Sequence, residues 1–298
     1  MTSASLTSLE TFQETGFLKL PNVIEVNKIT SLRTAFWHEV NDRFALSLDD
    51  PSSWFRNPSN PVGGTKAKRL NGMGPMMRDL KASGKFDVIE EMMQSAIDSI
   101  FGDNAWRPLD LWYSLLSFPG SETKWNVPHN SWHNDEPIVV GDSNPWSLFV
   151  FLLLDDVNVD MGATAVVSGS HRRAEQLAET IANSGQEAAI KAFDSVNSGL
   201  MDNPKSIRLL TTDQVLEPLT QEDSWMKALV TEGTPEQRIK QFVQEGSTFN
   251  GIEQKVVSLT GSAGDIIILN PRCLHSVSAN ISQHPRQVIR LDFRRNAS

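Results

Sequence analysis

Residues 264–275 read Gly-Asp-Ile-Ile-Ile-Leu-Asn-Pro-Arg-Cys-Leu-His. The four apolar residues at 266–269 stand between a Gly-Asp pair and an Asn-Pro pair, which is typical of a short buried strand bounded by turns. His275 follows this strand, and a second strand-like run, residues 286–293, begins with Arg286. A histidine on one strand and an arginine on the next can point into one pocket, where the planar guanidinium is suited to a bidentate contact with a carboxylate.

A second group of candidate ligands lies upstream, in the run Asn-Ser-Trp-His-Asn-Asp-Glu-Pro at residues 130–137. Residues i and i+2 of a strand project from the same face, so His133 and Asp135 can reach one metal ion. With His275 they make two imidazoles and one carboxylate, the ligand set that holds non-haem iron(II) and leaves positions open for a cosubstrate and dioxygen. On spacing alone, a His-x-Asp pair is more often a hydrogen-bonded pair in a loop. The downstream histidine and Arg286 are what favour the iron interpretation.

A zinc helix is the rival interpretation of the same run. His129 and His133 are four residues apart, the spacing with which two histidines of a helix share a zinc ion. Pro128, Pro137 and the polar residues between them weaken any helix here. The glutamate that a zinc protease motif needs directly after its first histidine is missing, because residue 130 is asparagine. We therefore prefer iron to zinc at this site.

Four ordered blocks of the chain resemble the phytanoyl-CoA dioxygenase-like family of iron(II)- and 2-oxoglutarate-dependent oxygenases. These blocks are residues 12–20, with a glycine before a strand; His-Asn-Asp at 133–135; the glycine-rich turn 162–171, with Ser168 where proline is usual; and Gly264, Asp265, His275, Asn280 and Arg286. The blocks extend over most of the chain, and their order makes the combined signal specific.

The resemblance implies a fold and a ligand set. The fold would be mainly β with flanking helices, built on a double-stranded β-helix (a jelly-roll, cupin-like core). Iron would be bound by His133, Asp135 and His275. Arg286 would bind the distal carboxylate of 2-oxoglutarate. Thr164 is a second candidate contact for 2-oxoglutarate, although a hydroxyl that is satisfied within its own turn is an equally good interpretation.

Two positions leave the contacts to the cosubstrate open. Some family members carry a hydroxyl two residues after the distal histidine, whereas this chain has Val277 there. Ser276 or Ser278 would have to take its place. Arg290 lies on the same strand face as Arg286 and is the alternative anchor, although the family spacing favours Arg286.

Composition is consistent with an ordinary globular enzyme. The 298 residues, 39% of them apolar, are enough for a single domain over residues 1–298. The chain lacks both a run of about 18 apolar residues and the start of a signal peptide, so we expect a cytoplasmic protein. The net charge of −9 disfavours nucleic acid and anionic membranes as partners. We expect a monomer or homodimer whose partner is a small-molecule substrate, and we expect its one cysteine, Cys273, to be a small buried residue.

The pattern of apolar residues predicts the remaining elements. Helices are expected over 6–15, 26–45 and 86–101, strands over 109–118 and 146–154, and long loops over 46–84. The two ligand histidines are 142 positions apart, which is wide for a jelly roll with short connections. The excess, residues 172–250, is expected to be a helical insertion, with helices over 173–193, about 213–229 and 235–244. It would act either as a lid over the barrel mouth or as a peripheral scaffold or dimer contact.

The function expected from these features is that of a dioxygenase that uses Fe(II), 2-oxoglutarate and O2. It would oxidise, and in the simplest case hydroxylate, a small organic metabolite, with release of succinate and CO2. A substrate from secondary metabolism is expected first, and a lipid or fatty-acyl group second. The alternatives are a redox-silent metal-dependent hydrolase or isomerase on a cupin-like barrel, and a non-catalytic ligand-binding jelly roll. Arg286 argues against the hydrolase, which needs no dicarboxylate anchor, and the complete ligand set argues against the non-catalytic protein.

Overall fold

The computed structural model of the protein describes residues 3–55, 69–72, 74–136, 138–139, 144–184, 191–194, 206–210 and 212–296. Its first elements are α1 (Ser3–Thr15), β1 (Phe17–Leu20), α2 (Val26–Phe44), the 3-10 helix η1 (Pro51–Phe55), β2 (Arg69–Gly72), α3 (Pro75–Ala82), α4 (Asp87–Phe101), β3 (Trp106–Ser117), β4 (Ile138–Val139) and β5 (Ser147–Leu153). The following elements are β6 (Thr164–Ser168), α5 (Ser170–Ser184), β7 (Lys191–Asp194), β8 (Ser206–Leu210), α6 (Thr212–Glu222), α7 (Ser224–Leu229), α8 (Pro235–Arg238) and the π-helix η3 (Ile239–Glu245). The last are β9 (Ser247–Phe249), β10 (Ile252–Ser258), β11 (Ile266–Leu269), β12 (His275–Val277) and β13 (Arg286–Arg295).

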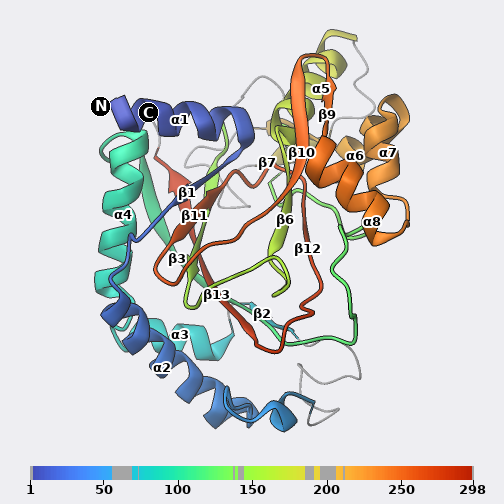
Figure 1. The fold of residues 1–298 in the computed structure, drawn as a ribbon. Helices are drawn as coiled ribbons and strands as arrows, with labels where there is room; N and C mark the ends of the chain where they lie inside the picture. Colours follow the sequence, from blue (N-terminus) through green and yellow to red (C-terminus); the bar gives the residue numbers. More distant parts are fainter. Residues whose placement is uncertain are drawn as a thin grey trace.

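Two antiparallel sheets form the core (Figure 1). The larger sheet has the strand order β1-β11-β5-β13-β3-β2, and the smaller sheet has the order β12-β6-β10-β9. Such non-consecutive neighbours in two sheets are typical of a jelly roll. The predicted double-stranded β-helix is therefore confirmed, although among the described residues helical ones outnumber strand ones, at 40% against 27%.

The strands of the larger sheet are covered on both faces. In β5, the odd-numbered residues of 149–153 belong to the apolar cluster between the sheets. The even-numbered residues of 148–152 belong to a different cluster, under the helices. Because successive side chains of a strand point to opposite faces, both sets are apolar and the strand reads as a continuous apolar run. The same alternation in β13 directs Arg286 and Arg290 toward the barrel interior, since Val288 between them lies in the interior cluster.

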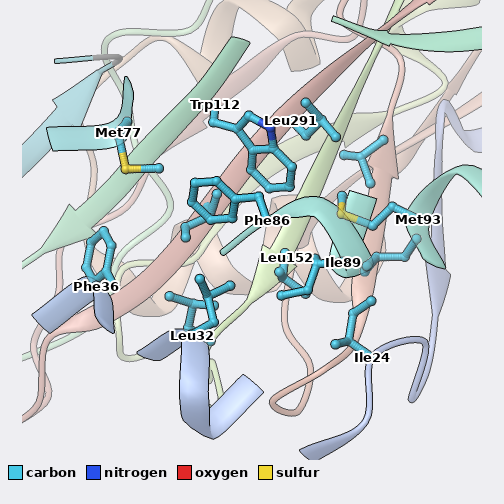
Figure 2. Close-up of a cluster of buried hydrophobic side chains, with 14 of the residues drawn as sticks. Ile24, Leu32, Phe36, Met77, Phe86, Ile89, Met93, Trp112, Leu152 and Leu291 are labelled. Carbon is cyan, nitrogen blue, oxygen red and sulfur yellow. The ribbon is translucent and has the colours of Figure 1, made fainter. Parts of the chain in front are cut away.

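Helices α1 to α4 cover the outer face of the larger sheet (Figure 1). Figure 2 shows the buried cluster that joins them to the strands, in which the rings of Phe86 and Trp112 stack with their centroids 4.2 Å apart and an interplanar angle of 6°. Ile89 of α4 lies in the same cluster as Leu152 and Leu291 of the sheet. The helices predicted over 26–45 and 86–101 are confirmed to within a residue at each end.

The region 46–84 differs from the prediction of long loops. It contains η1, the short strand β2 and the eight-residue helix α3, while residues 56–68 and 73 lie outside the described part. Pro75 begins α3, and Met76, Met77 and Leu80 on this helix are buried. A helix this short between Gly- and Pro-containing segments gives little periodic signal, so only its packing against the sheet reveals it.

The insertion packs on the outer face of the smaller sheet. Trp225 of α7 and Phe242 of η3 share a buried cluster with Val167 of β6 and Val256 of β10. Figure 1 shows α5 to α8 on the side of the molecule opposite to α1 to α4. The described helices of the insertion therefore pack against the smaller sheet, and its role as a lid, a scaffold or a dimer contact stays a prediction.

The predicted helix over 173–193 is too long. α5 ends at Ser184, and residues 191–194 form β7, which pairs with β8 and through it with β4 in a third sheet. Local periodicity cannot show this pairing, because β4 comes from the segment that follows the candidate metal motif. Residues 185–190, 195–205 and 211 of the insertion lie outside the described part.

Candidate metal centre

His133 and His275 lie opposite each other in an isolated antiparallel bridge. The backbone N–H of His133 donates to the carbonyl of His275 at 3.0 Å, and the N–H of His275 donates back to the carbonyl of His133 at 2.9 Å. Two residues later, the N–H of Asp135 donates to the carbonyl of Pro271 at 2.9 Å. Main-chain hydrogen bonds therefore join the two segments that carry the predicted ligands.

The three predicted ligand side chains converge. Oδ1 of Asp135 lies 3.6 Å from Nε2 of His133, and Oδ2 lies 3.6 Å from Nε2 of His275. One donor atom from each of the three residues lies within 4.8 Å of the other two. Donor atoms that each lie about 2.0–2.2 Å from one metal ion are separated by distances of this order. The geometry thus fits a single ion.

Each imidazole is oriented by its other nitrogen. Nδ1 of His133 is 2.7 Å from the carbonyl oxygen of Ser131, and Nδ1 of His275 is 2.9 Å from that of Cys273. A carbonyl can only accept, so Nδ1 is a donor in both rings, and Nε2, on the side of Asp135, is the atom that can bind a metal ion. This arrangement is typical of metal-binding histidines, whose second nitrogen fixes the tautomer.

The carboxyl group of Asp135 is an anion at neutral pH. Burial opposes its ionisation, but the hydrogen bond to His275 and the charges of His275, Arg290 and His133 outweigh burial and lower its pKa to about 2. One carboxylate and two imidazoles that bind through Nε2 are a suitable donor set for a divalent transition metal. The residues present therefore fit iron(II).

The arginine end of the barrel interior contains Arg286 and Thr164. Arg286 is 4% exposed, and its Nη1 donates to the carbonyl of Gly162 at 2.6 Å and to Oγ1 of Thr164 at 3.4 Å. Thr164 is paired with Val277 in the register of β6 and β12, two residues beyond the pairing of Val166 with His275. The structure thus brings both predicted cosubstrate contacts together in the barrel that holds the metal ligands.

Arg290, the alternative anchor, has a different environment. Its Nε lies 2.9 Å from Oδ1 of Asp292, and its Nη1 lies 3.4 Å from Oδ2 of Asp135. Its guanidinium carbon is 3.8 Å from the ring centroid of Phe149 and 4.4 Å from that of Tyr113. Burial raises the pKa of Asp292 to about 6, although Arg290 acts in the opposite direction. Because Arg290 is stacked and ion-paired beside the metal ligand, the geometry favours Arg286 as the anchor.

The two serines that could replace a hydroxyl at position 277 differ in their hydrogen bonding. The hydroxyl of Ser276 donates to the carbonyl of Asn130 at 3.0 Å, so it fixes the ligand loop. The hydroxyl of Ser278 is buried and has no hydrogen-bond partner in the described part of the chain. Ser278 therefore remains the candidate for the additional contact.

Cys273 is a buried free thiol. It is fully buried in the interior cluster, with Sγ 3.4 Å from Nδ1 of His171. Burial raises the pKa of its thiol to about 12. The expectation of a small buried residue is in agreement with this environment.

Sequence reasoning missed Glu136 and Arg272, two buried charged residues beside the ligands. Nε of Arg272 donates to Oε1 of Glu136 at 2.8 Å. The available signal was a charge inside each ligand-bearing segment, directly after Asp135 and three residues before His275. A sequence cannot show that two such distant charges meet.

Comparisons with known proteins support the family and the fold. The sequence profile of the Phytanoyl-CoA dioxygenase (PhyH) family matches residues 12–288. No curated protein matches the sequence. Within the described residues, no helix combines the length and apolar character needed to cross a bilayer.

Several solved structures share the fold. The chain is similar to AviO1 from Streptomyces viridochromogenes Tue57, at 15% identity and a TM-score of 0.52, over 100% of this chain and 98% of that chain. It is also similar to the non-haem, alpha-ketoglutarate-dependent carbocyclase SnoK from nogalamycin biosynthesis, at 15% identity and a TM-score of 0.53, over 99% and 84% of the two chains. EvdO2 from Micromonospora carbonacea var. aurantiaca, complexed with 2-oxoglutarate, matches at 15% identity and a TM-score of 0.50, over 98% and 91%. At these identities the similarity shows the fold.

Proposed function

The chain belongs to the phytanoyl-CoA dioxygenase (PhyH) family of iron(II)- and 2-oxoglutarate-dependent enzymes, and we propose that it oxidises a small organic metabolite, with hydroxylation as the simplest outcome. The observation that carries this proposal is the convergence of His133, Asp135 and His275 on one point. Arg286 in the same barrel supplies what a metal-dependent hydrolase does not need, a cationic partner for a dicarboxylate.

The metal would be held on one side of the barrel interior. His133 and His275 contribute Nε2, and Asp135 contributes a carboxylate oxygen, while the Nδ1 hydrogen bonds keep both rings in place. When bound, iron(II) with 2-oxoglutarate and dioxygen supplies oxidative decarboxylation to succinate and CO2, coupled to oxidation of a substrate C–H bond. Because a carboxylate occupies the third ligand position, a halide ligand has no vacant place there, which disfavours halogenation.

The remaining roles fall to the interior side chains. Arg286 and Thr164 would bind the distal carboxylate of 2-oxoglutarate, because both face the interior and already share a hydrogen bond. Phe149, Phe151 and Val288 are buried apolar walls of the same interior. Such walls limit access of bulk water and position the substrate C–H bond, which the chemistry requires.

Secondary metabolism is the substrate context that the comparisons support. SnoK is described as a carbocyclase from nogalamycin biosynthesis, so this fold also accommodates outcomes other than hydroxylation. The choice among hydroxylation, desaturation and ring formation would depend on how the substrate is oriented in the barrel.

The test is 2-oxoglutarate turnover by the purified protein. The protein is loaded anaerobically with iron(II), exposed to dioxygen with a panel of small metabolites, and assayed for succinate. We expect Asp135→Ala to abolish succinate formation, because it removes the anionic ligand. His129→Ala is the matched control and should retain activity, since the iron interpretation gives His129 no role.

Two results would contradict the proposal. Activity of Asp135→Ala close to that of the wild type would remove this residue from the ligand set. Metal binding without any succinate formation, with or without a substrate, would favour the hydrolase or isomerase alternative.

A further inference from the structure

Two buried, oppositely charged side chains lie beside the metal ligands in sequence. Glu136 directly follows Asp135 and is 3% exposed, and Arg272 precedes His275 by three residues and is 0% exposed. Nε of Arg272 lies 2.8 Å from Oε1 of Glu136. A charge-assisted hydrogen bond in the interior, where it is stronger than in water, therefore joins the two ligand-bearing segments.

The Glu136 carboxylate also binds the beginning of a core strand. Its oxygens accept hydrogen bonds from the backbone N–H groups of Trp146, at 2.9 and 3.0 Å, and of Ser147, at 2.8 Å. The hydroxyl of Ser147 donates to it at 2.9 Å. One carboxylate thus connects the ligand loop, the segment 271–275 and the first residues of β5.

Main-chain hydrogen bonds also join the ligand loop to the segment 271–275. The N–H groups of Asp135 and Glu136 both donate to the carbonyl of Pro271, at 2.9 and 3.2 Å. The side chain of Glu136 then reaches the next residue, Arg272. A shift of one segment along the other would break the main-chain and the side-chain contacts together, so the ion pair fixes the register.

Stability alone is a weak explanation for this pair. The cost of removing two charges from water can exceed their attraction, and an apolar replacement of similar volume is often neutral or stabilising. What the ion pair supplies is direction, because a guanidinium and a carboxylate meet in a defined geometry. Mutation of residues that orient metal ligands without binding the metal themselves typically changes metal affinity by about 10–100-fold.

We propose that Glu136 and Arg272 are positioning residues that fix the separation of Asp135 and His275, so that metal affinity depends on their ion pair. This inference rests on the proposed function, because it takes Asp135 and His275 as metal ligands. It does not depend on the identity of the organic substrate.

The central experiment replaces both charges by apolar side chains. Glu136→Leu/Arg272→Met keeps the volume of the pair but leaves the backbone N–H groups of Trp146 and Ser147 without their acceptor. The thermal midpoint of the metal-free protein should therefore fall, and metal binding is measured well below that midpoint. Nickel(II) is the probe, and calorimetry without 2-oxoglutarate measures its Kd. We expect the Kd to rise by about tenfold or more. A Kd within about twofold of the wild-type value would overturn the proposal, since this is well below the usual effect of such residues.

Glu136→Gln covers the case in which the double variant does not fold. The amide keeps the size of the side chain and one oxygen for Arg272, but it loses the charge and one acceptor for the backbone of β5. We expect this variant to fold and to bind nickel more weakly than the wild type. An unchanged nickel Kd in Glu136→Gln would overturn the proposal independently of the double variant.

Two controls distinguish a positioning role of the ion pair from a general loss of stability. Asp223 is a matched buried carboxylate that accepts from the N–H of Trp225 at 2.8 Å and from Gln254 at 3.0 Å, outside both ligand segments. Asp223→Asn should lower the thermal midpoint and leave the nickel Kd unchanged; a nickel defect equal to that of Glu136→Gln would count against a positioning role. His275→Ala should abolish tight nickel binding. If it does not, the proposed metal site fails, whatever the ion pair does.

Discussion

His133 and Asp135 lie in a loop at the candidate metal centre, whereas Thr164 and Arg286 face the barrel interior from the first positions of β6 and β13. At the metal end, main-chain hydrogen bonds join residues 133–135 to the distant segment 271–275. At the arginine end, strand alternation places the side chains, and they are already in contact. The metal end therefore depends on the folding of distant segments, and the arginine end can be altered one side chain at a time. We expect changes at the metal end to affect stability and metal binding together, and changes at the arginine end to act mainly on cosubstrate binding.

Arg238 should give the largest effect, because it supports the metal end from the insertion. It is 3% exposed and donates to the carbonyls of Val127 and Pro128, at 3.1 and 2.8 Å, in the segment that leads to the ligand loop. It also donates to the carbonyls of Ala228, Leu229 and Thr231. We expect Arg238→Met to lower the free energy of unfolding by about 3 kcal/mol or more, since each buried carbonyl left without a donor costs about 1–3 kcal/mol.

Denaturant unfolding and nickel titration of Arg238→Met would also test the role of the insertion. A scaffold predicts loss of stability and weaker metal binding together, whereas a lid alone predicts neither. Arg33→Met is the control, because Arg33 is partly exposed in an ion pair with Asp155 and should change stability by no more than about 1 kcal/mol.

The next effect is a pH dependence of stability that arises from His171, which contacts Cys273 next to the metal end. Burial lowers the pKa of His171 from 6.5 to about 4, although its hydrogen bond to the carbonyl of Gln13 acts in the opposite direction. Between these two values the unfolded chain binds a proton that the folded chain does not. Stability therefore falls as the pH falls through this window, by up to about 3 kcal/mol.

Denaturant unfolding of the wild type and of His171→Asn across this window isolates the contribution. We expect the wild type to lose more stability than the variant as the pH falls from about 7 toward 4. Parallel losses in the two proteins would show that other groups cause the acid sensitivity.

At the arginine end, Arg286→Ala should raise the concentration of 2-oxoglutarate needed for half-maximal turnover by more than about tenfold, because a contact between charged groups contributes roughly 1.5–3 kcal/mol. Thermal stability and nickel affinity should change little in comparison with Arg238→Met. Arg290→Ala is the matched comparison. If the requirement rises for Arg290→Ala and not for Arg286→Ala, the anchor is Arg290.

Thr164→Val should give the smallest effect. It removes one hydroxyl at nearly constant volume, and a typical hydrogen bond contributes roughly 0.5–1.5 kcal/mol, so we expect the 2-oxoglutarate requirement to rise by about two- to tenfold. Thr164→Ser keeps the hydroxyl and should behave like the wild type. If the 2-oxoglutarate requirement of Thr164→Val equals that of the wild type, the Thr164 hydroxyl does not contribute to cosubstrate binding.

Prediction from the sequence succeeded where the signal is local. The apolar run 266–269 is confirmed as β11, because a strand buried on both faces reads as a continuous apolar segment, and the strand from Arg286 is confirmed as β13. The prediction missed α3, extended the helix of 173–193 into β7, and left the position of the insertion open. In each of these cases the deciding contacts come from residues far away in the chain, which local periodicity does not contain.

By itself, the sequence determined the residue types and the order of the site: two histidines, an aspartate and an arginine, of which His275 and Arg286 lie next to strand signals. Only the tertiary structure decided that Asp135 meets both histidines, that Arg290 stacks on Phe149 beside that carboxylate, and that Glu136 pairs with Arg272. The physical reason is that side-chain direction follows from local backbone geometry, whereas the meeting of buried charges depends on how the sheets and the insertion pack.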